Sequence, residues 1–186
     1  MEGISKMAKI QQVEYSIDNK KFILRHAEIE DAEKLIELMK KLDVETTFLL
    51  READEFTLTI DQEKEFIKKQ RDSEINLLIL VEVDGKVIGS CGINGNIRKR
   101  LRHSANLGIA ILREYWGMGI GKKLIETGIK WTKENGMSRI TLQVDTNNYR
   151  AISLYLKLGF EIEGTLKNDK ILNDGSYRNT YTMALL

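Results

Sequence analysis

Three glycines stand at alternate positions in the stretch REYWGMGIGKKL, which covers residues 113–124. A β-type apolar segment (105–112) precedes them, and a segment with helical apolar spacing (119–134) follows. Glycine loses more chain entropy on folding than other residues, so this density indicates a need for positive φ or for close approach of another molecule. A strand-to-helix turn also presents unpaired N–H groups and the positive end of a helix dipole. Phosphate or pyrophosphate is the natural partner of such a turn.

Two common phosphate loops do not fit this stretch. The P-loop pattern G-x-x-x-x-G-K-[ST] requires glycine and serine or threonine where the chain has Trp116 and Lys123. The dinucleotide pattern G-x-G-x-x-G requires a third glycine at position 122 or 124, where lysine and leucine stand. A tight turn that needs glycine for its own backbone remains the commoner explanation of an isolated glycine match.

Length and composition predict an ordinary soluble domain. The 186 residues suit one domain, 1–186, and 42% apolar with 31% charged residues is typical of a globular protein. A net charge of +1 gives no electrostatic argument for nucleic acid or an anionic membrane. The single cysteine, Cys91, fits a reducing cytoplasm, and two distant histidines offer no zinc-type spacing. We find no signal-peptide core and no apolar run of membrane-spanning length, so we expect a cytoplasmic protein without a metal.

The order of periodic segments predicts one α/β (α+β) domain with a largely antiparallel front and a strand–helix–strand–helix–strand back half. Residues 1–21 form an N-terminal extension that ends in a hairpin strand. An Asp-Gly pair at 84–85 predicts a second hairpin. The predicted strands are the hairpins 13–26 and 75–97, then 105–112, 139–144, 160–166 and 177–186. The predicted helices are 29–42, 59–73, 119–134 and 149–158, and residues 43–58 are a loop or broken helix.

A second motif, NNYRAISLYLKLGFEIEG, covers residues 147–164. Asn148 and Tyr155 are seven residues apart, or two helical turns, so they share one helix face with Ala151 between them. Taken alone, Asn148 would be interpreted as a helix cap and Tyr155 as a half-buried aromatic residue. The two motifs in this order favour a shared site.

The glycine stretch and this second motif resemble those of the GNAT acetyltransferases. Their acyl-CoA loop, [QR]-x-x-G-x-[GA], is matched by WGMGIG (116–121), with tryptophan at the first position, and their later block N-x-x-A-[IL]-x-[LF]-Y-x-K-x-G-F is matched from Asn148 onward. The resemblance spans residues 22–186, and its specific part is 106–164. It implies a GNAT-like mixed, mainly antiparallel central sheet flanked by helices, with the glycine loop between the fourth strand and the third helix.

The resemblance also implies acetyl-CoA as cosubstrate. Main-chain N–H groups of the fourth strand would bind the pantetheine and face the developing oxyanion, and the loop would hold the pyrophosphate. Tyr155 resembles the family's general acid, since a phenol with a pKa near 10 is protonated at neutral pH. For the general base, Asp145 and acids of the 43–55 loop are candidates, and none is assigned. The implied cofactor-binding residues are Ile109, Ala110, Ile111, Trp116, Gly117, Met118, Gly119, Ile120, Gly121, Lys122 and Asn148.

The leading hypothesis is an N-acetyltransferase that moves acetyl from acetyl-CoA to a primary amine of a small molecule or of a protein or peptide terminus by direct attack. The alternative is a non-catalytic acyl-CoA-binding module or sensor of the same fold. A nucleic-acid-binding role has only the basic run 98–103 behind it, which we interpret as a solvated turn. We count a homodimer among the expected assemblies and expect no nucleic-acid or membrane partner.

The segment 43–65 carries eight acidic residues against only Arg51 and Lys64. Such a rim would raise the local concentration of a cationic acceptor such as a polyamine. The plainer interpretation is a solvated helix and loop.

Overall fold

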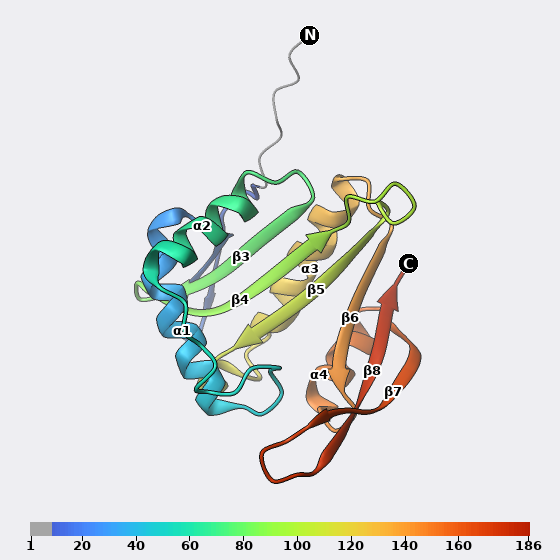
Figure 1. The fold of residues 1–186 in the computed structure, drawn as a ribbon. Helices are drawn as coiled ribbons and strands as arrows, with labels where there is room; N and C mark the ends of the chain where they lie inside the picture. The colour runs from blue at the N-terminus through green and yellow to red at the C-terminus, as the bar shows by residue number, and fades with distance from the viewer. Residues whose placement is uncertain (1–8) are drawn as a thin grey trace.

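The computed structural model describes residues 9–186, so the first eight residues of the predicted N-terminal extension lie outside the described part. Eight strands form one sheet in the order β1-β2-β3-β4-β5-β6-β8-β7 (Figure 1). Neighbouring strands are antiparallel except for β5 and β6. The strands are β1 Val13–Ile17, β2 Lys20–His26, β3 Asn76–Val83, β4 Lys86–Gly95, β5 Ser104–Ile111, β6 Arg139–Asp145, β7 Glu161–Ile171 and β8 Tyr177–Leu185.

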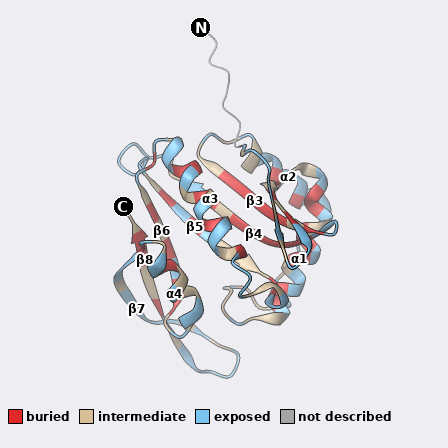
Figure 2. Cartoon of the chain, turned by 180° about the vertical axis from the view of Figure 1, so that it is seen from behind, coloured by how far each residue is buried: buried red, intermediate tan, exposed pale blue. Residues whose placement is uncertain are grey.

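Four α-helices cover the two faces of this sheet. Helices α1 (Ala32–Glu45) and α2 (Ile60–Arg71) lie on one face, and α3 (Ile120–Glu134) and α4 (Tyr149–Lys157) lie on the other (Figures 1 and 2). Between them, β3 and β4 are buried along most of their length, as Figure 2 shows. This arrangement confirms the predicted fold class: a mixed, mainly antiparallel sheet flanked by helices.

The two tight hairpins form where the sequence predicts them. Asp84 and Gly85, between β3 and β4, both have positive φ (49° and 77°), as the favoured two-residue hairpin turn requires. Asp18 and Asn19 do the same between β1 and β2. Aspartate and asparagine tolerate this region better than other non-glycine residues, which explains a tight turn without glycine there.

Strands β5 and β6 pair only briefly and then separate. Their parallel register covers Ser104–Asn106 against Arg139–Thr141, after which each strand continues without the other. Figure 1 shows the two strands diverging toward the loops that follow them. The resulting gap in the sheet leaves main-chain groups of β5 without a strand partner on that side.

Strand β7 is longer than the sequence predicts. It continues to Ile171 instead of ending near residue 166, with a register irregularity between Leu166 and Lys170 and positive φ at Asn168. The added residues include the polar run KNDK (167–170), whose composition is poor in β-formers, so the pattern gave no strand signal. Residues 167–169 lie in the irregularity, and pairing with β8 resumes at Lys170 opposite Arg178. This pairing carries Lys170 to the end of β6.

Candidate functional site

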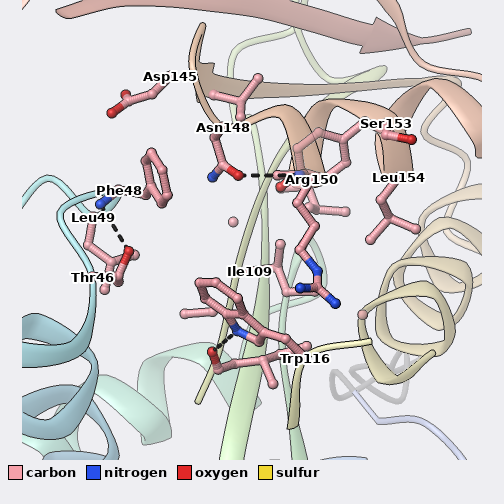
Figure 3. Close-up of a pocket in the computed structure, with 18 of the residues that line it drawn as sticks. Thr46, Phe48, Leu49, Ile109, Trp116, Asp145, Asn148, Arg150, Ser153 and Leu154 are labelled. Atoms are coloured by element: carbon pink, nitrogen blue, oxygen red, sulfur yellow. Dashed lines mark hydrogen bonds between the residues drawn. The ribbon is translucent and has the colours of Figure 1, made fainter. Parts of the chain in front are cut away.

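A cleft of about 800 Å³ opens at the gap between β5 and β6. Its walls come from β5, the glycine loop, the start of α3, the end of β6, the α4 face and the loop after α1. This size lies within the usual range for small-molecule sites. The structure therefore brings the two predicted motifs to one cavity, with Ile109, Trp116 and Asn148 around a common space (Figure 3).

The backbone conformation and the surroundings of each loop glycine differ, and they explain why glycine stands at each position. Gly117 has φ +87°, and a Cβ there would lie 2.8 Å from the Arg150 guanidinium. Gly119 has φ +78° with no atom within 4 Å of such a Cβ, so open space borders it. At Gly121 a Cβ would meet the Leu154 side chain at 3.2 Å, so this glycine lets α3 approach α4 closely. Only the first two need the left-handed backbone conformation.

The start of α3 presents free main-chain donors to the cleft. The first helical bond runs from the Lys123 N–H to the Gly119 carbonyl (3.2 Å). The preceding N–H groups, of residues 120–122, have no main-chain acceptor in the described part of the chain, as expected for a helix N-terminus. Together with the helix dipole they form an anion-binding position. Lys122 also lines the cleft, and its ammonium lies 3.7 Å from Glu126 on the exposed face of the helix.

Trp116, one of the predicted cofactor-binding residues, has its main-chain donor occupied within the protein. Its N–H donates to the Arg113 carbonyl (3.1 Å), so that donor is not available to a ligand. Its indole N–H donates to the Ile111 carbonyl (2.7 Å) at the end of β5. The guanidinium groups of Arg113 and Arg150 lie 5.6 and 5.5 Å from its ring centre. Tryptophan at this motif position therefore fixes the loop to β5 and orients Arg150.

The main-chain N–H groups of the three predicted β5 residues, Ile109, Ala110 and Ile111, do not all face the gap between β5 and β6. The Leu112 N–H donates to Ile88 on β4 (3.0 Å), and hydrogen-bonded pairs of an antiparallel ladder recur every second residue. Ala110, opposite Ser90, is therefore paired with β4 through its main chain, and its N–H does not face the gap. The N–H groups of Ile109 and Ile111 point the other way, toward the gap.

Asn148 caps α4, and its side-chain oxygen accepts from the Ala151 N–H (3.2 Å). The capping interpretation and the site interpretation are therefore compatible, because Asn148 also lines the cleft, where its side-chain NH₂ remains as a donor.

Tyr155 lines the cleft although the residue is only 7% exposed, and its ring packs against Phe160, with ring centres 5.8 Å apart. Burial raises the pKa of the Tyr155 phenol above its ordinary value of 10, with a smaller contribution from Cys91. The cause is that a low-dielectric environment disfavours phenolate. Tyr155 is therefore neutral, and able to donate a proton, throughout the physiological pH range.

Two of the carboxylates considered as bases, Asp145 and Asp43, are already engaged. Asp145 is 2% exposed, one of its oxygens accepts from Lys170, and the other accepts from Arg178 at 3.0 Å. Asp43 is buried and held by Arg51. Asp145 is the one acidic side chain among the described residues that line the cleft.

The acidic segment 43–65 does not form the cleft rim that its composition suggested. Besides Asp43, which pairs with Arg51, the Glu45 side chain accepts from the Arg113 N–H (2.9 Å), and Glu63 is buried. From this segment the cleft is lined by polar or apolar residues, namely Thr46, Phe48, Leu49 and Leu50. The plainer interpretation of this segment, a solvated helix and loop, therefore fits the structure better than an acidic rim, because the sequence shows charges but not where each side chain points.

Two functional candidates escaped the sequence analysis. Arg150 lies within the second motif at a position that the motif leaves open, although arginine beside a phosphate loop is a usable signal. In the described part of the chain its guanidinium has no carboxylate partner. Lys170 could not be found, because its approach to Asp145 depends on the unforeseen extension of β7.

Comparison with known proteins agrees with this geometry. Residues 33–160 match the model of the acetyltransferase (GNAT) family. The chain belongs to this family. The L-amino acid N-acetyltransferase AaaT of Escherichia coli is 30% identical over 169 residues, covering 87% of this chain and 96% of that protein. The resemblance inferred from the two motifs is thus confirmed.

Solved structures show the same fold. A GNAT-family acetyltransferase from Streptococcus pneumoniae superposes with a TM-score of 0.85 at 34% identity, covering 89% of this chain and 99% of that one. An acetyltransferase named yncA from Salmonella typhimurium, solved with its cofactor acetyl-CoA, gives a TM-score of 0.77 at 17% identity, with 88% and 92% covered. At that identity the second comparison supports the GNAT fold alone.

Within residues 9–186, no helix is long and apolar enough to cross a membrane. Over the same residues, no cluster of three or more His, Cys, Asp or Glu side chains has the arrangement of a metal site.

Proposed function

We propose that this GNAT protein transfers acetyl from acetyl-CoA to a primary amine by direct attack, with Tyr155 as the general acid. The observation that carries the proposal is the meeting, in one cleft, of free helix N–H groups, an open β5 edge and a buried neutral phenol. The Escherichia coli relative named above is an N-acetyltransferase, and this chain belongs to the same acetyltransferase family, which supports the reaction type.

The described residues fit the pyrophosphate of acetyl-CoA. Open space beside Gly119 and the free N–H groups of residues 120–122 give room and donors for an anion. Arg150 and Lys122 supply positive charge at the same loop. Arginine suits this task because its planar fork binds phosphate oxygens in pairs.

The rest of the cleft suits acyl transfer. The N–H groups of Ile109 and Ile111 lie where they can bond the thioester carbonyl and the negative charge that develops on its oxygen. When the amine nitrogen bonds to the carbonyl carbon and the carbon–sulfur bond breaks, the Tyr155 hydroxyl gives its proton to the departing sulfur. Because both oxygens of Asp145 accept from cations, water takes the proton of the attacking amine, and water returns a proton to the Tyr155 oxygen after the thiol has formed.

A two-part assay tests this function. Thiol release from acetyl-CoA is measured with a panel of primary amines, and acetyl-CoA binding is measured separately by calorimetry. Amine-dependent thiol release with an acetylated product supports the transferase. Binding without amine-dependent release supports the alternative, a non-catalytic acyl-CoA-binding protein of this fold.

We also propose a domain organisation, a cellular location and an assembly for this protein. A single domain over residues 1–186 and the lack of a bound metal stay predictions. The cytoplasmic location is supported by the single cysteine, which is buried and free, as suits a reducing compartment. The homodimer stays a prediction, which sedimentation equilibrium tests.

A further inference from the structure

A buried group of charges closes the end of the cleft opposite the glycine loop. It consists of Asp145 at the end of β6, Lys170 on β7 and Arg178 on β8. The exposed fractions of the three side chains are 1%, 18% and 16%. Two cations share one carboxylate, so the group carries a surplus positive charge in a place with little water.

Arg178 uses three of its five N–H groups within the protein, and it does not line the cleft. One of its terminal nitrogens donates to Asp145 (3.0 Å) and to the Thr47 carbonyl (3.2 Å), and the other donates to the Thr47 hydroxyl (3.0 Å). Its guanidinium also lies 5.3 Å from the centre of the Phe48 ring. These contacts tie the β7–β8 hairpin to the loop after α1. Arg178 is therefore a structural clamp.

Lys170 differs from Arg178 because it lines the cleft. Its ammonium carries three N–H groups, and the described residues account for one of them, through Asp145. Asp145 holds this ammonium at the wall and keeps the side chain from reaching into solvent. An ammonium fixed in this way presents its remaining donors to whatever occupies the cleft.

The surplus charge has no second acid to neutralise it within the cleft. Besides Asp145, the charged side chains that line it in the described chain are cations: Lys122, Arg150, Lys157 and Lys170. Asp174, in the β7–β8 turn, is close enough to Arg178 for its pKa to be affected, but it is fully solvent-exposed and does not line the cleft. Lys122 and Arg150 are assigned above to the pyrophosphate, so Lys170 is the cation beside Asp145 that is left for the acceptor. An anionic group on the acceptor would complete the site there, whereas a cationic group would meet repulsion.

We infer that the acetyl acceptor is an amine that also carries a carboxylate, a compound of the amino-acid class, and that Lys170 binds this carboxylate. The inference rests on the proposed function and names the acceptor class for the same cleft. Leu42, Phe48 and Leu49 line the adjacent wall, so an acceptor with an apolar side chain fits best. It replaces the expectation of a cationic acceptor, which assumed that the acids of segment 43–65 face the cleft.

The test compares acceptors that differ only in the carboxylate. L-Leucine and L-leucinamide are assayed with the wild-type protein and with Lys170→Met. Lys170→Arg restores the charge, and Lys167→Met removes an exposed lysine of the same strand that does not line the cleft. Thermal melting of each variant checks that it is folded. Because the two acceptors differ in amine pKa, the quantity compared is the change in their kcat/KM ratio between variants.

We expect Lys170→Met to lower the leucine-to-leucinamide ratio by about 10- to 100-fold, the range that a hydrogen bond to a charged group is worth. Lys170→Arg should recover most of the ratio, and Lys167→Met should leave it unchanged. As a probe without an amine, 4-methylpentanoate should inhibit wild-type protein competitively against leucine, while 4-methylpentanamide should not. That comparison needs no variant, so it decides the matter even if Lys170→Met does not fold.

Three results would overturn the inference. The first is an unchanged ratio in folded Lys170→Met, and the second is equal inhibition by 4-methylpentanoate and its amide. The third is a preference for spermidine over leucine, which would leave acetyl transfer intact. If no amine of any class yields an acetylated product, the failure belongs to the proposed function itself.

Discussion

Gly119 and Gly85 offer a matched pair for testing the glycine loop. Both have a left-handed backbone, with φ of +78° and +77°, and at neither does any atom lie within 4 Å of the position that a Cβ would take. Gly119 starts α3 at the cleft, whereas Gly85 lies in the β3–β4 hairpin, away from it. Substitution of either residue by aspartate adds the same side chain and the same charge in the same conformation.

The expected cost to stability is similar at the two positions. A non-glycine residue in the left-handed region costs about 1–2 kcal/mol, and aspartate lies toward the lower end. For a chain of this size each kcal/mol lowers Tm by about 2–4 °C. Both variants should therefore stay folded at 25 °C, with Tm values a few degrees below that of the wild type.

The expected effect on acetyl-CoA binding differs sharply. A carboxylate about 5 Å from one pyrophosphate charge, at an effective dielectric constant of about 20, costs about 3 kcal/mol. Calorimetric titration should thus show Kd for acetyl-CoA raised by about 100-fold or more in Gly119→Asp, and unchanged in Gly85→Asp. Wild-type affinity in a folded Gly119→Asp protein would refute the assignment of this loop to the pyrophosphate.

Two further predictions concern the other cleft residues. Tyr155→Phe should lower kcat by about 10²-fold or more with little change in Kd for acetyl-CoA, because it removes only the proton donor. Since burial raises the pKa of Tyr155 above 10, kcat of the wild type should show no alkaline loss from this group below pH 10. A Tyr155→Phe protein with full kcat would mean that Tyr155 is a core residue without a catalytic role. Arg150→Met should raise Kd for acetyl-CoA by about 10-fold, because a charge-assisted contact is lost. Lys130→Met, which removes an exposed lysine of α3, should leave this Kd unchanged. Equal effects of the two substitutions would mean that only the overall positive charge of the protein matters for binding.

The sequence was informative where local chemistry limits the choice of residue. Alternate glycines between a strand pattern and a helix pattern predicted a turn with positive φ and free N–H groups, and Gly117 and Gly119 have that geometry. The seven-residue spacing of Asn148 and Tyr155 predicted that both face one site, and both line the cleft. These features depend on residues close together in the chain.

The sequence was less informative where tertiary contacts decide. The direction of the Ala110 N–H follows from the β4–β5 register, which no local pattern encodes. The Trp116 N–H is occupied through a short turn of residues 113–115, and its indole bonds the end of β5. Lys170 reaches Asp145 only because pairing with β8 extends β7 through a polar run. Charge counts alone likewise misplaced the acids of segment 43–65.

The most direct test of the central claim follows both products of one reaction. The protein is incubated with acetyl-CoA labelled in its acetyl group and with an amine panel that includes L-leucine, L-leucinamide and spermidine. Free thiol is titrated while mass spectrometry measures the labelled product. We predict amine-dependent thiol release with one acetylated amine formed per thiol, abolished or strongly reduced by Tyr155→Phe. Thiol release without an acetylated amine, or tight acetyl-CoA binding with no release for any amine, would contradict the account.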